Sequence, residues 1–204
     1  MVATVDAGDD VGALAVDVGV PVEVAVCTQL FDEVDGDRQA LAVGRADDER
    51  PSPEARLKAL GIKLPAAPRP VAIYVPAVVS GKLLFSSGHG PRTAEGKLIT
   101  GRVGEGLTLQ QGKQAARIVG LNVLSSVRAR LGTLDRVVRL VKVLGMVNST
   151  ADFKQHPQVI NGFSELMVEV FGEKLGKGAR SAVGMGSLPS NIPVEIEAIF
   201  EIRS

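Results

Sequence analysis

The chain has 204 residues, of which 45% are hydrophobic and 23% charged, which is enough for one globular domain with a sizeable core and too few for two. Six Phe, one Tyr and no Trp argue against modules that stack nucleic-acid bases or cage cations on aromatic side chains. The single cysteine, Cys27, excludes an internal disulfide and a cysteine-based zinc site, and two histidines are too few for a histidine-rich metal site. We therefore expect no metal and no cofactor.

No run of about 18 apolar residues is present, so no membrane-spanning helix is expected. The N-terminal stretch carries Asp6, Asp9 and Asp10 where a secretory signal would carry positive charge. We expect a cytoplasmic protein that does not interact with a membrane.

The overall net charge of zero hides two segments of opposite charge. Residues 1–50 hold 12 acidic and 3 basic side chains, whereas residues 51–204 hold 11 acidic and 20 basic ones, giving net charges of −9 and +9. The first segment has no sustained period of 2 or 3.6 residues, so we place a domain boundary near Pro51. Three interpretations of residues 1–50 remain open: a disordered acidic tail, a small strand-forming extension built on residues 16–26, or a start codon assigned too far upstream.

The first elements after the boundary are short. Residues 53–60 have helical spacing and are followed by Gly61, which favours a helix end there, and a proline-rich connector covers residues 65–70. Two β-prone runs, residues 73–79 and 83–87, flank a turn at residues 80–82 and predict a hairpin. A further turn is expected at residues 88–91.

Two helices and three strands are predicted in the remainder. Thr108 and Gln111 form a capping-box pattern that begins a long amphipathic helix ending at Gly132. Residues 137–147 form an apolar central strand, and a second helix runs from about Pro157 to Gly172. Two strands follow, at residues 180–185 and 194–202, and in the last strand apolar side chains alternate with Glu195, Glu197 and Glu201.

This element order predicts an α+β fold in which one mixed β-sheet is covered on a single face by two helices. The opposite face of the sheet carries Glu195 and Glu197 in the middle of a strong strand. Such a face is more consistent with a subunit interface or a site wall than with open solvent. We therefore expect a closed homo-oligomer.

No phosphate loop, dinucleotide fingerprint, G-x-S-x-G or HExxH motif is present. Two charged residues are the leading catalytic candidates. Arg180 opens a strand after a glycine-rich loop that would let a ligand enter, and its guanidinium can hold a carboxylate with two hydrogen bonds; the alternative is a surface ion pair. Glu195 could position or activate a water, or could simply pair with a neighbouring arginine on the sheet.

Three residues near the first hairpin are candidates for substrate binding. Ser87 and His89 lie in the sequence Ser-Gly-His-Gly-Pro, where His89 is either a proton shuttle or a solvated loop histidine. Tyr74, the single tyrosine, could orient a substrate through its hydroxyl or belong to the core. His156, next to a proline at a helix start, is expected to serve local structure.

These residues resemble the Rid/YjgF family of reactive intermediate deaminases, in its divergent branch of longer bacterial members. The resemblance covers residues 53–203. It rests on four stretches in the family's order: Tyr74 with Ser87-Gly88 thirteen residues later, residues 145–148 with Asp152-Phe153 downstream, residues 178–183, and residues 188–198. The last two are the most specific, because they place Glu195 fifteen residues after Arg180.

The resemblance implies a chorismate-mutase-like fold, a homotrimer, and sites in clefts between subunits. The implied activity is cofactor-free hydrolysis of reactive enamines and imines, such as 2-aminoacrylate, to 2-keto acids and ammonia. In that reaction Arg180 would bind the substrate carboxylate, Glu195 would hold the attacking water, and Tyr74 and Ser87 would line the pocket. An imine is already electrophilic, so anchoring the carboxylate and aligning a water supplies much of the required catalysis.

This sequence departs from the family pattern at four points. The family's Tyr-Ser-Gln-Ala is replaced by residues 74–77 with the sequence Tyr-Val-Pro-Ala, and its Ser-Gly-Gln ends in His89. Ala182 replaces a cysteine that often follows the arginine, and the asparagine common in the second helix has no clear match, since Asn161 lies a few residues off. These changes alter the pocket, whereas Arg180 and Glu195 are retained.

Two other functions are compatible with the sequence. A non-catalytic, regulatory trimer could use the Arg180 cleft to hold a small carboxylate. Older family names, endoribonuclease and translation inhibitor, suggest RNA as a partner, with slight support from the basic excess after residue 50. We favour RNA least, because the densest basic cluster has no interleaved aromatic residues; it consists of Arg128, Arg130, Arg136, Arg139 and Lys142.

Overall fold

The computed structural model describes residues 50–69 and 72–204. All of the described helices and strands lie between Pro53 and Ile202. All three interpretations of residues 1–50, including the strand-forming extension at residues 16–26, concern residues outside the described part of the chain, apart from residue 50.

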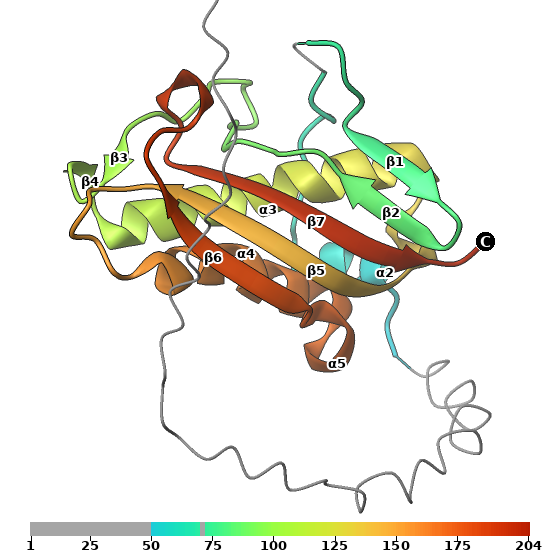
Figure 1. Cartoon of the computed structure of the whole chain (residues 1–204). Helices are drawn as coiled ribbons and strands as arrows, with labels where there is room; N and C mark the ends of the chain where they lie inside the picture. Colours follow the sequence, from blue (N-terminus) through green and yellow to red (C-terminus); the bar gives the residue numbers. More distant parts are fainter. Residues whose placement is uncertain (1–49, 70–71) are drawn as a thin grey trace, which may run out of the picture. The chain divides into compact units, whose positions relative to one another are not determined.

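One mixed, five-stranded sheet forms the centre of the described domain (Figure 1). Its order is β1 (Ala77–Ser80), β2 (Leu83–Ser86), β7 (Val194–Ile202), β5 (Val137–Asn148) and β6 (Ala179–Met185). Neighbouring strands are antiparallel except β5 and β6, which are parallel. A second sheet of two short strands, β3 (Arg102–Val103) and β4 (Gly106–Leu107), was not predicted.

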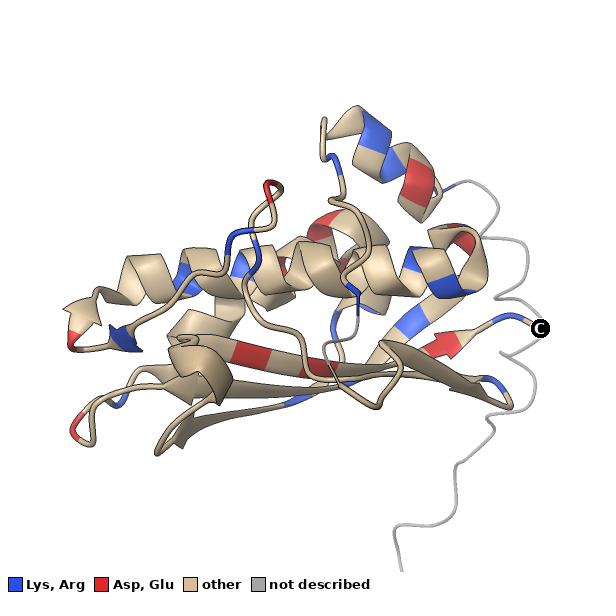
Figure 2. Cartoon of the chain, turned by 90° about the horizontal axis from the view of Figure 1, so that it is seen from above, with Lys and Arg blue, Asp and Glu red and all other residues tan. Residues whose placement is uncertain are grey.

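Two long helices, α3 (Leu109–Leu131) and α4 (His156–Phe171), cover one face of the sheet (Figure 2). The predicted capping box is present, since Gln111 N–H donates to the Thr108 hydroxyl and Thr108 N–H donates to the Gln111 side chain. Gly132 ends α3 in the left-handed conformation. The α+β plan with two helices on one face is confirmed.

Shorter helices complete the domain. They are α2 (Pro53–Ala59), which packs on α4, α5 (Glu173–Gly176), and the 3₁₀ turns η1 (Leu134–Arg136) and η2 (Pro189–Asn191). The residues before Arg180 were expected to form an open loop. The glycine-rich loop expected at residues 176–179 is shorter in the structure, because α5 ends at Gly176 and β6 begins at Ala179. Gly176 packs so closely on the Met167 carbonyl that a side chain would overlap it.

The core lies between the helices and the sheet. Along β7, Val194, Ile196 and Phe200 are fully buried on the helix side, while Glu195 and Glu197 point to the other face. Figure 1 looks onto this second face, which the described helices leave uncovered. Alternation along β7 therefore fixes which residues enter the core and which are available to a site.

The first strand is shorter than predicted. The sequence indicated a strand over residues 73–79, but pairing with β2 begins at Ala77 and Tyr74 lies in a bend before it. Pro76 has no N–H to donate to a neighbouring strand, which explains why the ladder begins after it. As a result Tyr74 is available to line a cavity rather than being fixed in the sheet.

Candidate functional site

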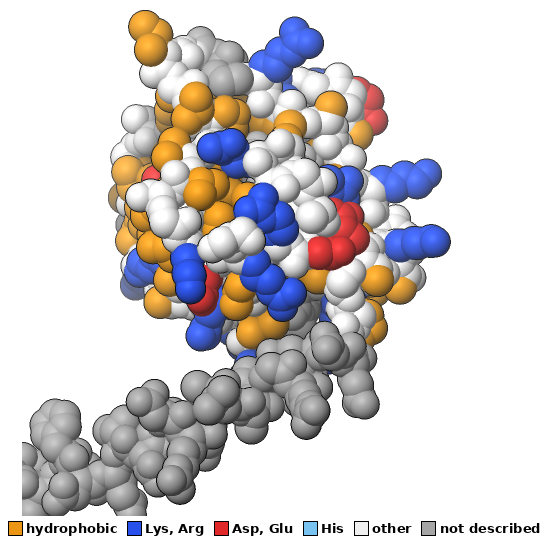
Figure 3. All heavy atoms as spheres, turned by 90° about the vertical axis from the view of Figure 1, so that its right-hand side faces the viewer, with side chains coloured by type: hydrophobic (Ala, Val, Ile, Leu, Met, Phe, Trp, Pro, Cys, Tyr) orange, Lys and Arg blue, Asp and Glu red, His pale blue; other side chains and the backbone are white. Residues whose placement is uncertain are grey.

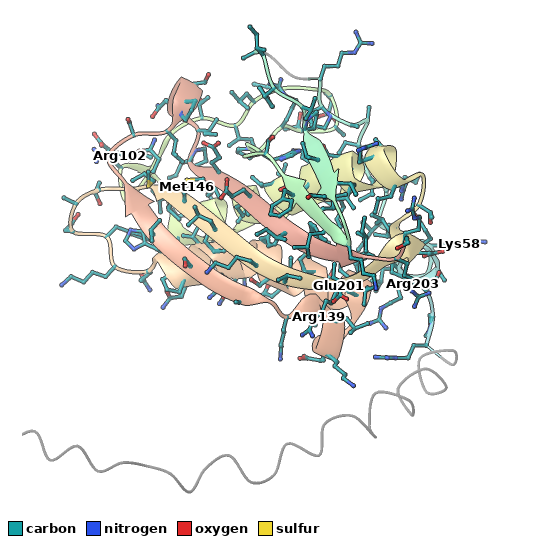
Figure 4. The ribbon with its side chains drawn as sticks, turned by 45° about the vertical axis from the view of Figure 1, so that its right-hand side comes forward. Lys58, Arg102, Arg139, Met146, Glu201 and Arg203 are labelled. Atoms are coloured by element: carbon teal, nitrogen blue, oxygen red, sulfur yellow. The ribbon has the colours of Figure 1, made fainter. Side chains whose placement is uncertain are left out.

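Four of the predicted site residues meet at one cavity. Tyr74, Ser87, His89 and Glu195 all line a hollow of about 420 Å³, a volume typical of small-molecule pockets. It lies at the end of β7 where Glu195 pairs with Met146 of β5. Figure 4 shows Met146 toward one end of β5 and Arg139, which pairs with Glu201, toward the other.

Glu195 is the acidic residue of this cavity. Its carboxylate lies against Gly88, where an added Cβ would overlap Oε1. The side chain is half-buried, and no ion pair to it is present among residues 50–69 and 72–204. Burial raises the pKa of Glu195, and the negative charge of Glu197 raises that pKa further. A carboxyl group with a raised pKa is suited to accepting and returning a proton near neutral pH.

Gly88 is held in place by the hydrogen bonds of its neighbour His89. The His89 backbone exchanges two hydrogen bonds with Ile196, at 2.9 and 3.1 Å. Its imidazole is 5% exposed, with Nδ1 2.7 Å from the Ser87 carbonyl and Nε2 2.8 Å from the Ser126 hydroxyl. Burial lowers the pKa of His89. His89 is thus not the solvated loop histidine that one interpretation expected, and both of its ring nitrogens have partners within the chain.

The segment before β1 forms another part of the cavity wall. The Ser87 hydroxyl donates to the Val75 carbonyl at 2.6 Å, and Ser87 N–H donates to the Pro76 carbonyl at 2.9 Å. These bonds hold the Tyr74 segment beside the glycine-containing loop. Tyr74 itself is 44% exposed, so the tyrosine belongs to the surface of the cavity and not to the core.

Arg180 occupies a different place. It lies on the edge strand β6, where its Nη1 donates to Asn161 Oδ1 at 2.9 Å and to Ser164 Oγ at 3.0 Å. No ion-pair partner of Arg180 occurs in the part of the chain that the structure describes. Because both Nη1 protons are used, the edge formed by Nε and Nη2 is left for a ligand, and that edge matches the two oxygens of a carboxylate.

Arg180 and Glu195 point to opposite faces of the sheet. Arg180 pairs with Val143, which faces the helices, whereas Glu195 pairs with Met146 three residues further along β5. Side chains an odd number of residues apart on a strand point to opposite faces. Within a single copy of the chain, Arg180 and Glu195 therefore lie on different sides of the sheet.

Sequence reasoning missed several residues of these two regions. Asn161 and Ser164 hold Arg180, although Asn161 had been considered out of place. Their spacing of three, which puts both on one side of α4, was the available signal. Arg69 and Arg92 line the Glu195 cavity, and no motif indicated them. Buried Asn122 of α3 also lines it.

The basic cluster considered for RNA binding is partly engaged within the domain. Arg128 forms an ion pair with Glu54 at 3.0 Å, and Arg136 donates to the carbonyl of Arg203 at 3.1 Å. Figure 3 shows Lys and Arg side chains on one face of the molecule, interspersed with hydrophobic and acidic ones. Among the described residues no helix has the length and apolar character needed to cross a membrane.

Known proteins are similar to this chain in sequence and in fold. A family model described as "YjgF/chorismate_mutase-like, putative endoribonuclease" matches residues 54–195, a range that contains Arg180 and ends at Glu195. The chain belongs to the YjgF family. Its mixed sheet with helices is the chorismate-mutase-like fold of that family.

Individual YjgF-family relatives match the same part of the chain. Protein TCP17 of Trypanosoma cruzi is 45% identical over 150 residues, covering 74% of this chain and 94% of TCP17. The crystal structure of Atu1372 from Agrobacterium tumefaciens, a protein of unknown function, has 43% identity and a TM-score of 0.67, over 74% of this chain and 94% of that one. The crystal structure of a Shewanella oneidensis MR-1 protein described as a "putative endoribonuclease" has 29% identity and a TM-score of 0.70, and the match covers 74% of this chain and 99% of that one.

Proposed function

We propose that the protein hydrolyses reactive imines and enamines of small 2-amino acids to 2-keto acids and ammonia. The observation that carries the proposal is the half-buried carboxylate of Glu195, without an ion pair among the described residues, at the wall of a cavity of about 420 Å³. Burying a carboxylate without a cation costs free energy, and such a cost is typical of a functional site.

The proposed reaction needs one base and one carboxylate anchor. Glu195 accepts a proton from a water as the water oxygen bonds to the imine carbon and the C=N π electrons move to nitrogen, and the Glu195 carboxyl returns this proton to the nitrogen, giving a carbinolamine. Glu195 then accepts the proton of the carbinolamine hydroxyl and passes it to the nitrogen as the C–N bond breaks, so that ammonia leaves and a carbonyl group remains. The reaction consumes one water and involves no oxidation or reduction.

Arg180 is the proposed anchor for the substrate carboxylate. Asn161 and Ser164 hold one side of its guanidinium, so the ligand-binding edge is oriented before substrate arrives. A carboxylate bound by two parallel N–H donors is fixed in direction as well as in position. This orientation would present the imine carbon to the water at Glu195.

Because Arg180 and Glu195 point to opposite faces of one sheet, we propose that each site takes Arg180 from one subunit and Glu195 from another. The uncovered sheet face carries exposed apolar side chains that a second copy would bury: Val78, Phe85, Val183 and Met185. We expect a homotrimer with three such sites, and gel filtration with light scattering measures the number of subunits directly.

The decisive experiment measures keto-acid and ammonia release from freshly generated 2-aminoacrylate and 2-iminobutanoate. Wild type is expected to accelerate release, and Arg180→Ala and Glu195→Gln are expected to abolish the acceleration. Arg139→Ala is the matched control, because it removes an exposed arginine at the other end of β5 from Met146. It should retain full activity.

Two results would contradict the proposal. Well-folded wild type that binds 2-ketobutyrate without accelerating hydrolysis of any imine would indicate a carboxylate-binding protein. RNA cleavage that depends on Arg139 and weakens steeply with salt would indicate a nuclease.

A further inference from the structure

Two cationic residues, Arg69 and Arg92, line the cavity that holds Glu195. Arg92 lies on the loop after Gly90, and Arg69 contributes to the same cavity from the connector. Neither arginine forms an ion pair with an acidic side chain within residues 50–69 and 72–204. A cavity wall that contains cationic groups without acidic partners is suited to an anionic ligand group.

The position of Arg92 is fixed by several bonds. Its Nη1 donates to the Gly96 carbonyl at 2.7 Å, and its backbone pairs with Leu98 across the loop. The Asn122 amide, 2% exposed on α3, donates to the carbonyls of Arg92 at 3.0 Å and of Gly90 at 3.2 Å. Arg92 is thus held by the helix layer and by its own loop, and no acidic side chain among the described residues neutralises its charge.

A single substrate carboxylate does not account for both Arg180 and Arg92. In the proposed reaction the carboxylate next to the imine carbon is bound by Arg180 of a neighbouring subunit. Arg92 belongs to the same chain as Glu195 and lines the same cavity, so it can meet a different part of the same substrate. The cavity of about 420 Å³ leaves room for a side chain longer than that of 2-aminoacrylate.

We propose that Arg92 binds a second, distal carboxylate of the substrate, and that the preferred substrates are imines with the carbon skeletons of aspartate and glutamate. The inference rests on the proposed function, since it names the substrate class of the same site. Arg92 is a specificity residue in this proposal: it contacts the side chain of the substrate and takes no part in the proton transfers at Glu195.

The test compares dicarboxylic with monocarboxylic imines. A flavin amino-acid oxidase, with catalase present, generates them from acidic amino acids or from alanine and 2-aminobutyrate. An added amine traps the imine that is not hydrolysed, so hydrolysis is measured as the decrease in trapped product when the protein is present. For wild type, kcat/KM should be higher for the dicarboxylic imines. Arg92→Met should lower that value about 10- to 100-fold, the usual effect of losing a hydrogen bond between charged groups, and change the monocarboxylic value little.

Lys97→Met is the matched control, because it removes a positive charge from the same loop at a residue that does not line the cavity. Lys97→Met should leave kcat/KM unchanged for both classes of imine. Thermal unfolding checks that each variant is folded. Hydrolysis of monocarboxylic imines alone, or an Arg92→Met variant that weakens both classes equally, overturns the inference and leaves the proposed function standing.

Binding separates the two proposals when turnover is absent. Calorimetry with 2-oxoglutarate and 2-ketobutyrate should show tighter binding of the dicarboxylate, and Arg92→Met should abolish the difference. Equal affinity for the two acids would overturn the inference. Failure of every imine substrate, with the preference for the dicarboxylate intact, would overturn the proposed hydrolysis and retain Arg92 as the binder of the distal carboxylate.

Discussion

The carboxylate of Glu195 occupies the space that a Cβ atom on Gly88 would fill. The two residues come from neighbouring extended segments, which are joined by the hydrogen bonds between His89 and Ile196. The absence of a side chain at Gly88 therefore determines where the Glu195 carboxylate lies, and Gly88 acts as a positioning residue for the proposed base.

Gly88→Ala is expected to displace the Glu195 carboxylate and lower kcat by about tenfold or more, because catalytic geometry tolerates little displacement. Stability should fall by no more than about 1 kcal/mol, since a side-chain end can move aside. Gly186→Ala is the control, because a Cβ at Gly186 has nothing within 4 Å. Full activity of Gly88→Ala would show that the observed carboxylate position is not required.

Glu197→Gln is expected to shift the acid limb of the pH–rate profile to lower pH. The Glu197 charge raises the pKa of Glu195, so its removal lowers that pKa and the active, ionised form persists at lower pH. The shift should be partial, because burial is the larger cause. Glu201→Gln, on the same strand, should leave the profile unchanged, and an unmoved acid limb in Glu197→Gln would argue against Glu195 as the base.

Asn161→Ala is expected to raise KM about three- to tenfold with a smaller change in kcat, because Arg180 loses one hydrogen bond that orients it. The same substitution in an Arg180→Ala background should have no further effect on activity. Steady-state kinetics on the two single variants and the double variant measure this coupling. Additive losses would mean that Asn161 acts independently of Arg180.

Mixing of two inactive variants tests whether sites form between subunits. Arg180→Ala and Glu195→Gln, co-expressed with different tags and purified as mixed oligomers, should regain activity. If each site takes one residue from each of two subunits, random assembly restores about a quarter of the sites. No recovery in verified mixed oligomers would place both residues of a site in one chain.

Gly162→Ala is expected to destabilise the fold by about 1–3 kcal/mol, because its Cβ would overlap the Lys113 carbonyl and force α3 and α4 apart. Gly120→Ala should cost less, since its Cβ would meet only side-chain atoms of Leu166, Phe163 and Met167. Urea unfolding measures both differences. Equal stability of the two variants would show that the helices readily separate.

Local patterns were enough to predict most of the elements. The capping box at Thr108, the glycine stops at Gly132 and Gly172, and the alternation along residues 194–202 each involve residues close in sequence, so their meaning does not depend on the rest of the chain. Gly61 also follows the first helix as predicted. The strand predicted at residues 73–79 is shorter in the structure and begins at Ala77. The prediction relied on the apolar residues and did not take into account that Pro76 cannot donate a hydrogen bond to a neighbouring strand.

Which residues come together at the site depends on the tertiary structure. The sequence identified Tyr74, Ser87, His89 and Glu195, and the fold brings them to one cavity. Their relation to Arg180 follows from strand register: pairing with β5 places Arg180 and Glu195 on opposite sheet faces. Register is set by contacts between distant segments, which a single sequence does not display.

The sequence by itself determined the fold class, the helix ends and the candidate charged residues, because these depend on local conformational preference and on side-chain chemistry. Only the tertiary structure decided that Asn161 holds Arg180, that His89 is buried, and that Arg92 shares a cavity with Glu195. Each of these relationships joins segments separated by many residues, and the packing of the helices on the sheet is what brings those segments together.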